Sequence, residues 1–88
     1  MEKETILQEA DRIVNGQRAQ DYGSVSESFS AIAVGWSSIA KTTITADQVA
    51  LMMIWLKVCR ANNNTKHKDS WLDIAGYVAC WEKMENER

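Results

Sequence analysis

The sequence contains no proline and only four glycines, the two residue types that most often interrupt helices. A fold of many short strands needs frequent turns rich in these residues, so their scarcity argues against a β-sandwich. With 45% hydrophobic and 25% charged residues, the chain also lies outside the composition range of disordered sequences. We therefore expect a single all-α globular domain over residues 1–88.

Cysteine and histidine are nearly absent, which limits the metal chemistry open to the chain. Cys59 and Cys80 stand alone without a CxxC spacing, and the single histidine, His67, is well separated from both. This spacing does not match a structural zinc site. We expect both cysteines to be small buried apolar residues, and we predict neither a metal nor a cofactor.

A strong excess of charge of either sign is also lacking, with a net charge of −2 and a pI near 5.3. Such a chain has no overall attraction for duplex nucleic acid or an anionic membrane. No apolar stretch reaches the ~18 residues of a membrane span, and the first residues are charged and amphipathic, unlike a signal peptide. The sequence therefore predicts a cytoplasmic protein that binds neither duplex nucleic acid nor membranes.

Apolar residues recur at intervals of three and four in the first half of the chain. Residues 4–15 predict a surface helix with one buried stripe, which the following Asn-Gly pair ends. After a polar loop, Ser24 or Ser26 is expected to cap a second helix that runs to about Lys41. Its apolar stripe contains Phe29, Ile32, Ala33, Trp36 and Ile39 or Ala40.

A third helix is predicted from about Ala46 to Ala61, because Thr45 and Gln48 match the capping box that opens helices. Residues 49–56 are apolar without interruption, so periodicity alone does not exclude a strand, but the cap and the Ala, Leu and Met content favour a helix. A helix that is apolar on every side must be buried on every side. Since 88 residues supply too few neighbours to cover it, we predict a homo-oligomer.

Three consecutive asparagines at residues 62–64 predict a turn before the last helix. We expect that helix to begin at Thr65 or Asp69, to run to about Glu85, and to fray into solvent at its polar end. The short connection predicts an antiparallel hairpin with the third helix. Four tryptophans fall on the apolar stripes and are expected in the core or at a subunit interface: Trp36, Trp55, Trp71 and Trp81.

Two pairs of charged residues on the hairpin have both a structural and a functional interpretation. Lys57 and Arg60 are three residues apart, and Asp69 and Asp73 are four apart, so each pair shares a helical face. An antiparallel hairpin brings Lys57 level with Asp73, and Arg60 level with Asp69 or Ser70. In the structural interpretation these charges neutralise one another. In the functional one, the basic pair holds phosphate and the acids hold Mg²⁺ or orient the bases.

A second candidate constellation is the segment Arg18-Ala-Gln-Asp21-Tyr22-Gly23. A guanidinium forks to phosphate and a phenol ring stacks on a base, so the segment suits the lip of a nucleotide site. Alternatively, Asp21 makes an Asx turn, Tyr22 packs on the first helix and Gly23 supplies a positive φ. Further along, His67 lies in a short basic run that is most simply a solvated turn, without a nucleophile or orienting partner nearby in sequence.

These motifs follow one another in a characteristic order: Arg18 to Gly23, then Trp36, then Asp47 to Arg60, then His67 to Tyr77. The order resembles that of an uncharacterised family of small phage and prophage proteins, from about Ile6 to Trp81. The stretch around Asp73 is also distantly similar to the acidic signature of the all-α MazG-type nucleoside triphosphate pyrophosphohydrolases. That similarity implies an oligomeric helical bundle in which acidic residues on facing helices hold Mg²⁺.

On the MazG-type match Asp73 would be a metal ligand, but Ser70 stands where a glutamate is expected, and the partner motif of three glutamates is missing. With two carboxylates in place of about four, Mg²⁺ would be poorly held, so we expect binding without hydrolysis and do not expect an enzyme. The predicted ligand is a nucleotide or related phosphorylated metabolite, such as a host signalling nucleotide sequestered in the host cytosol. The predicted ligand-binding residues are Arg18, Asp21, Tyr22, Lys57, Arg60, His67, Asp69 and Asp73.

Two alternatives remain open at this point. One is enzymatic, a divergent MazG-like pyrophosphohydrolase or a nucleotide kinase. The other is a protein-interaction module, in which the exposed part of the third helix docks on a host protein.

Overall fold

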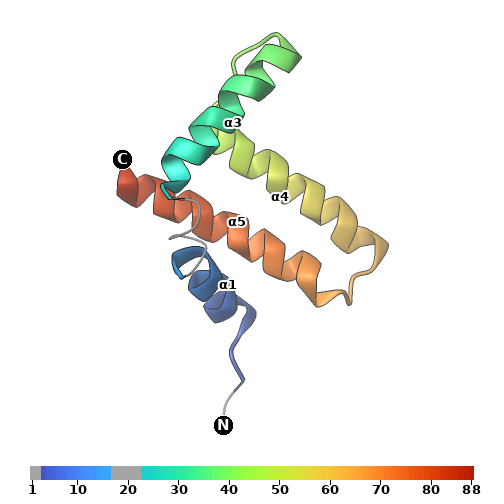
Figure 1. Ribbon diagram of the computed structural model, residues 1–88. Coiled ribbons are helices and arrows are strands. Elements are labelled where there is room, and N and C mark those ends of the chain that lie inside the picture. Colours follow the sequence, from blue (N-terminus) through green and yellow to red (C-terminus); the bar gives the residue numbers. More distant parts are fainter. Residues whose placement is uncertain (1–2, 17–22) are drawn as a thin grey trace.

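The computed structural model describes residues 3–16 and 23–88, and helices account for most of them (Figure 1). No strand occurs within these ranges, which confirms the predicted all-α fold. Helices α4 and α5 form the predicted antiparallel hairpin, α1 packs against α5, and α3 crosses α4 and the end of α5. The helices are α1 (Ile6–Asn15), α3 (Val25–Ala40), α4 (Ala46–Asn63) and α5 (Lys68–Glu87).

Side-chain caps define where the first helices begin. Thr5 and Gln8 form a reciprocal capping box at α1, with hydrogen bonds of 2.8 and 3.1 Å. Thr45 and Gln48 form the predicted box at α4, at 2.9 and 3.1 Å. The Ser24 hydroxyl accepts a backbone N–H of the first turn of α3 at 3.2 Å. The predicted starts of α3 and α4 are therefore confirmed, while α1 begins slightly later than predicted.

The helix ends differ more from the prediction. Helix α4 continues to Asn63, slightly beyond its predicted end at about Ala61, and so takes in two of the asparagines that were predicted to form the turn. Asparagine competes with helical hydrogen bonding in the middle of a helix, but in the last turn the carbonyl groups have no helical partner to lose. Helix α5 begins at Lys68 and runs to Glu87 rather than fraying after Met84, whose side chain is 0% exposed.

The hydrophobic core is small and lies where α3 crosses the hairpin. Its buried members are Phe29 and Ala33 of α3, Val49 and Ala50 of α4, and Met84 of α5. Half-buried apolar side chains surround them, among them Val25, Ile32, Trp36, Met53 and Tyr77. Met84 is the buried α5 residue of this cluster, so its side chain ties the end of α5 to α3 and α4.

The last turn of α5 also caps the start of α3. The Glu87 carboxylate accepts hydrogen bonds from the Ser24 hydroxyl at 3.2 Å, from the Val25 N–H at 3.2 Å and from the Ser26 N–H at 3.0 Å. The first N–H groups of a helix have no helical acceptor, and the positive end of the helix dipole attracts an anion. The predicted fraying tail is therefore a structural contact.

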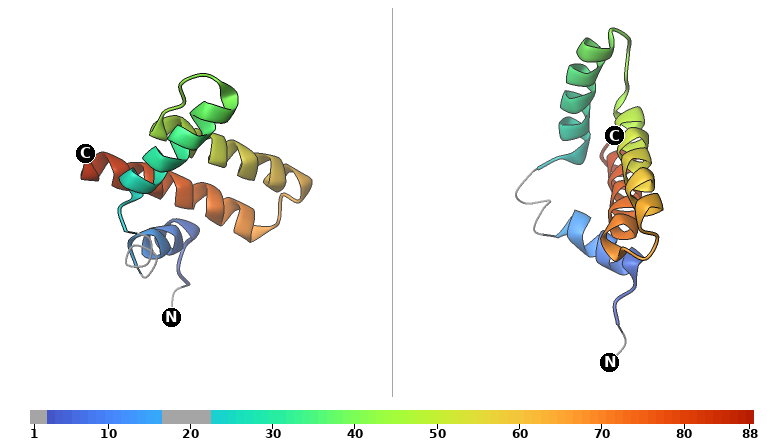
Figure 2. Two further views of the ribbon diagram at one scale, coloured as in Figure 1. Left: turned by 45° about the horizontal axis from the view of Figure 1, so that its top comes forward. Right: turned by 90° about the vertical axis from the view of Figure 1, so that its right-hand side faces the viewer.

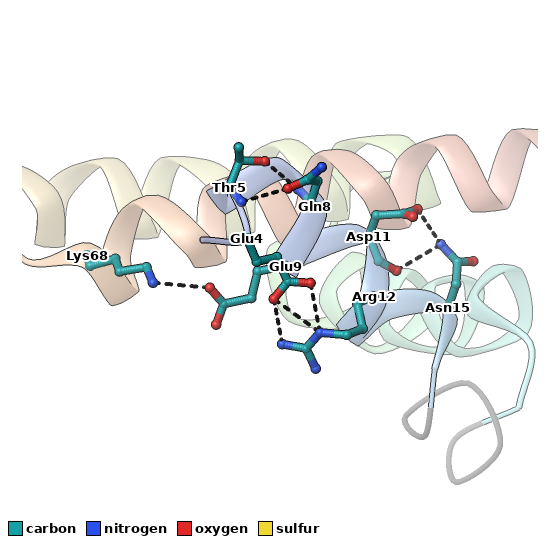
Figure 3. A network of polar contacts seen from close by, with 8 residues as sticks. All are labelled: Glu4, Thr5, Gln8, Glu9, Asp11, Arg12, Asn15 and Lys68. Carbon is teal, nitrogen blue, oxygen red and sulfur yellow. Dashed lines mark hydrogen bonds and ion pairs between the residues drawn. The ribbon is translucent and has the colours of Figure 1, made fainter. Parts of the chain in front are cut away.

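Helix α1 lies along α5 and buries two of its side chains. Ala10 and Val14 are its buried residues. At its start Lys68 of α5 pairs with Glu9 at 3.2 Å, and at its end the Lys83 ammonium donates to the Val14 carbonyl at 3.3 Å. Figure 3 shows the polar side of α1, where Arg12 pairs with Glu4 and the Asn15 side chain donates to Asp11.

The exposed pair Glu4 and Arg12 stabilises the segment before α1 only locally. The Arg12 guanidinium donates to both carboxylate oxygens of Glu4, at 3.0 and 3.1 Å. These hydrogen bonds hold the pKa of Glu4 below its usual value of 4.5, and they raise the pKa of Arg12. Both groups are in solvent, so their pair adds little to the fold.

The tryptophans are less buried than the sequence predicts. Trp36 packs half-buried against the core, but Trp55, Trp71 and Trp81 are 67%, 48% and 44% exposed. Assignment of these three to the core of one chain is therefore wrong. The physical reason is that α1 and α3 lie on the same side of the hairpin and leave the other side uncovered (Figure 2, right). Within the described ranges, no helix has the length and apolarity needed to cross a bilayer.

Candidate functional site

Lys57 of α4 and Asp73 of α5 meet across the hairpin, as predicted. The Lys57 ammonium lies 3.1 Å from a carboxylate oxygen of Asp73, and the two side chains are 20% and 46% exposed. The register of an antiparallel hairpin with its turn after Asn63 places them level with each other. Since its charge is already matched, Lys57 has less attraction left for a phosphate than the sequence suggested.

Asp69 and Asp73 both line a hollow between α1 and α5. The hollow has a volume of about 260 Å³, and its other walls are mostly apolar, including Ile13, Leu72 and Tyr77. The two carboxylates lie one turn apart on the face of α5 that meets α1. The predicted pairing of Arg60 with Asp69 is therefore wrong, because Asp69 faces α1 rather than α4.

A second hollow lies at the tip of the hairpin and has polar walls. It measures about 390 Å³ and is lined by Arg60, Asn63, Asn64, His67 and Ser70. Arg60 and Ser70 therefore lie level with each other on the hairpin, as predicted, while their pairing stays a prediction. We call this feature the tip hollow.

Charges are unevenly distributed at the tip hollow. Arg60 forms no ion pair with any described residue. Lys68, which follows His67, is directed to Glu9 of α1 instead. The five lining residues include no carboxylate, so the hollow offers one unpaired cation and several neutral hydrogen-bonding groups.

Backbone and side-chain hydrogen bonds fix the loop that forms the tip. The Asn64 side-chain oxygen accepts the Lys66 N–H at 3.2 Å, and the Asn64 carbonyl accepts the His67 N–H at 3.0 Å. The Trp71 indole donates to the Thr65 carbonyl at 2.9 Å, which ties the first turn of α5 to the loop. Short polar residues that bond to nearby backbone favour such turns. The position of the tip hollow is therefore set by the loop itself.

Three members of the tip hollow were missed by sequence reasoning as site residues: Asn63, Asn64 and Ser70. The asparagine run signalled only a turn, and Ser70 signalled only a departure from an enzyme motif. Ser70 is in fact 6% exposed, a buried hydroxyl at the start of α5. The run of short polar side chains in the turn is the signal that could have pointed to a hollow with polar walls.

The Arg18, Asp21 and Tyr22 constellation lies outside the described residues, and its place relative to the tip hollow stays a prediction. Gly23 directly after it has a φ of 72°, as predicted for the alternative in which it completes a turn.

The two cysteines are not the buried pair that the sequence predicts. Cys59 is exposed on α4, and Cys80 is half-buried on α5. The prediction for Cys59 fails because none of the described residues covers that side of α4. Among the described residues, no group of three or more His, Cys, Asp or Glu side chains is placed to hold a metal ion.

Comparison with known proteins identifies the family. Residues 5–85 match the family described as a domain of unknown function, DUF6378. The chain belongs to this family. Its relatives include the Gene 55 protein of Mycobacterium phage L5, 45% identical over 82 residues, which are 92% of this chain and 53% of that protein. The Gene 55 protein of Mycobacterium phage D29 is 38% identical over 84 residues, 96% of this chain and 56% of that protein.

These matches confirm the predicted resemblance to a family of small phage proteins. The chain spans about half the length of the phage relatives, so activities of a whole relative are not carried over to it. No solved structure matches the chain. The distant similarity to MazG-type pyrophosphohydrolases stays a prediction.

Proposed function

We propose that this member of the DUF6378 family binds the phosphate of a nucleotide or related phosphorylated metabolite at the tip hollow, without hydrolysing it. The supporting observation is the chemistry of the lining: an unpaired guanidinium, an imidazole, two amides and a hydroxyl face one hollow. A guanidinium forks to two phosphate oxygens, and amide and hydroxyl groups donate to the others. No carboxylate on the lining repels the anion.

The size of the tip hollow agrees with a small ligand. Pockets for such ligands measure roughly 300–1,000 Å³, and the tip hollow, at about 390 Å³, falls at the lower end. That volume suits a phosphate group and part of a nucleoside, with the remainder in solvent. A base-stacking group such as Tyr22 would have to come from outside the described residues.

In this proposal Arg60 carries most of the electrostatic attraction, and Lys57 carries little. Lys57 is committed to Asp73 at 3.1 Å, whereas Arg60 has no ionic partner among the described residues. A phage protein that binds a nucleotide and leaves it intact would sequester it. We propose a host signalling nucleotide, held in the host cytosol, as the ligand class.

The test is a thermal-shift screen of the purified chain against inorganic phosphate and linear and cyclic nucleotides. A ligand that binds the folded state raises Tm in proportion to its affinity and concentration. For the ligand that does so, Arg60→Ala should weaken binding about ten- to a hundredfold, the loss of one charged hydrogen-bonding partner worth about 1.5–3 kcal/mol. Arg12→Ala, which removes an exposed arginine of α1, is the matched control.

Chromatography of the incubated mixture should recover the ligand unchanged. Release of product in the presence of Mg²⁺ would instead favour the MazG-like alternative. If no compound shifts Tm, or if Arg60→Ala binds as well as the unmodified chain, the proposal is wrong.

A second candidate function, docking on a host protein, is favoured by the outer edge of α4. Met52, Trp55 and Leu56 are 44%, 67% and 43% exposed, and Cys59 one turn further is exposed as well. The spacing i, i+3, i+4 and i+7 is that of an amphipathic helix that inserts into an apolar groove. This candidate replaces the first if the nucleotide screen is negative.

A further inference from the structure

One side of the α4–α5 hairpin is covered and the other is bare. Viewed from the turn of the hairpin, α1 and α3 lie on the same side of the two long helices (Figure 2, right). Among the described residues, α1 contacts only α5, and α3 contacts α4 and α5. The second side therefore has no cover from any described element.

The bare side is apolar. Two shallow hollows on it show which side chains share it: one is lined by Leu51, Ile54 and Trp81, among others, and the second by Val58 and Trp71, among others. None of the lining residues comes from α1 or α3. The large apolar side chains here are 37–65% exposed. We call them the open face: Leu51, Val58, Trp71, Val78 and Trp81.

The spacing of the open face is that of a helix-pairing seam. On α5 the apolar positions 71, 74, 78 and 81 alternate by three and four, and on α4 the positions 51, 54, 58 and 61 do the same. This is the heptad spacing that packs a helix against a partner at about 20°. One exposed heptad seam can be buried by one additional helix. Two seams side by side, as on this hairpin, can be buried by a second pair of helices, which gives a four-helix bundle.

The exposed area of the chain gives the size of the missing contact. Its accessible surface is 6496 Å², whereas size scaling gives about 5,200 Å² for a monomer of 10.0 kDa, so roughly 1,300 Å² is in excess. A stable protein–protein interface removes about 800 Å² from each partner, and obligate dimers more. The radius of gyration, 14.0 Å, also exceeds the roughly 12 Å of a compact domain of this length. The surplus is larger than the area that one such interface removes from each partner, so the chain has enough uncovered surface for a dimer contact.

We propose that a second copy of this chain covers the open face, so that the two hairpins form a four-helix bundle around a two-fold axis. In such an interface the same patch faces itself, and a patch with apolar seams on two antiparallel helices is complementary to its own copy. The seam positions are uncharged, and Asp47, which borders the hollow at Trp81, is paired with Arg88 of the same chain at 2.7 Å. The face therefore offers little basis for choosing an oppositely charged partner. The tip hollow and the edge of α4 take no part in this contact, which is independent of the proposed function.

The test compares two valine-to-glutamate variants by light scattering after size-exclusion chromatography. The unmodified chain should have twice the 10.0 kDa mass of one copy. Val78→Glu, on the open face, should halve that mass, because a carboxylate would be buried unpaired at the seam. Val34→Glu, on α3 and 72% exposed in the chain, should leave it doubled. Arg60→Ala should also leave the mass doubled.

If Val78→Glu fails to fold, dilution of the unmodified chain decides. The Tm of a dimer rises with protein concentration, and that of a monomer does not. The tryptophan emission of the chain should shift to longer wavelength on dilution, because Trp71 and Trp81 become exposed to water. The helical circular dichroism signal should persist. A single-copy mass at all concentrations, a Tm independent of concentration, or loss of the dimer in Val34→Glu but not in Val78→Glu would overturn the proposal.

Discussion

The Lys57–Asp73 ion pair shows how strongly exposure limits what a good contact contributes. Its geometry is that of a strong pair, with the Lys57 nitrogen 3.1 Å from the Asp73 oxygen. Breaking a truly buried pair by removing one partner costs several kcal/mol. Asp73 is 46% exposed, however, so water screens much of the attraction and already solvates the carboxylate.

We therefore predict a small coupling energy for this pair. In a double-mutant cycle with Lys57→Met and Asp73→Asn, the coupling should be about 0.2–1 kcal/mol. The Lys68–Glu9 pair, at 3.2 Å and with its lysine 60% exposed, serves as the reference. The same cycle with Lys68→Met and Glu9→Gln should give a coupling energy no larger than that of the first pair. Urea unfolding of the four proteins in each cycle measures both. A coupling above about 2 kcal/mol for the first pair would mean that it behaves as buried.

Of the two ion pairs predicted across the hairpin, the structure contains Lys57–Asp73 but not Arg60–Asp69. The spacing of Asp69 and Asp73 correctly places both on one face of α5. It does not say whether that face meets α4 or α1, because either neighbour satisfies the same periodicity. Asp73 lies at the boundary and reaches Lys57, whereas Asp69 faces the α1 hollow and leaves Arg60 unpaired. Without a carboxylate partner among the described residues, the Arg60 guanidinium is available to a ligand in the tip hollow.

Helix starts were predictable because they depend on residues close in sequence. The capping box of Thr45 and Gln48 is a local device, complete within four residues. Helix α5 has no comparable signal, since His67 precedes it without a side-chain cap. Its far end depends instead on Met84 and Glu87, whose partners are on α3 and α4. Contacts at such sequence separation cannot be inferred from local pattern.

The contact of Glu87 with the start of α3 should stabilise the fold measurably. Glu87→Gln keeps the shape but removes the charge and one acceptor oxygen from three donors, so we expect a loss of about 1 kcal/mol in the free energy of unfolding. Glu82→Gln, at an exposed position of the same helix, should cost less than half as much. Urea unfolding gives both values, and the Ser26 amide shift in NMR reports the lost contact. Equal losses in the two variants would show that the capping contact is not stabilising.

At the scale of the molecule, the sequence predicted a surplus of apolar surface but not its location. The apolar run from Val49 to Leu56 cannot be covered by the remaining helices, and Leu51 is indeed 65% exposed. Hydrophobicity identifies which residues favour burial, but not which neighbour buries them. The placement of α1 and α3 on one side of the hairpin follows from packing between distant segments, and it turns a general excess into one defined face.

The same arrangement makes the stability of the chain uneven. Helix α1 contacts only α5 among the described residues and buries only Ala10 and Val14. Helices α3, α4 and α5 share the cluster that contains Val49 and Met84, both 0% exposed. Local opening needs less free energy where few apolar contacts must break. Helix α1 should therefore open independently of the other three.

Amide hydrogen exchange tests this division. We predict faster exchange for the hydrogen-bonded amides of α1 than for the central amides of α4 and α5, by at least a factor of ten, which corresponds to about 1.4 kcal/mol. Val14→Ala should accelerate exchange in α1 alone, because it removes contacts between α1 and α5 only. Met84→Ala should accelerate exchange in α3, α4 and α5, since a truncated methionine in the core that these helices share lowers their stability by about 2–5 kcal/mol. If Val14→Ala instead raises exchange equally in α4, then α1 belongs to the same cooperative unit as the core, and the few contacts that hold it are stronger than their burial suggests.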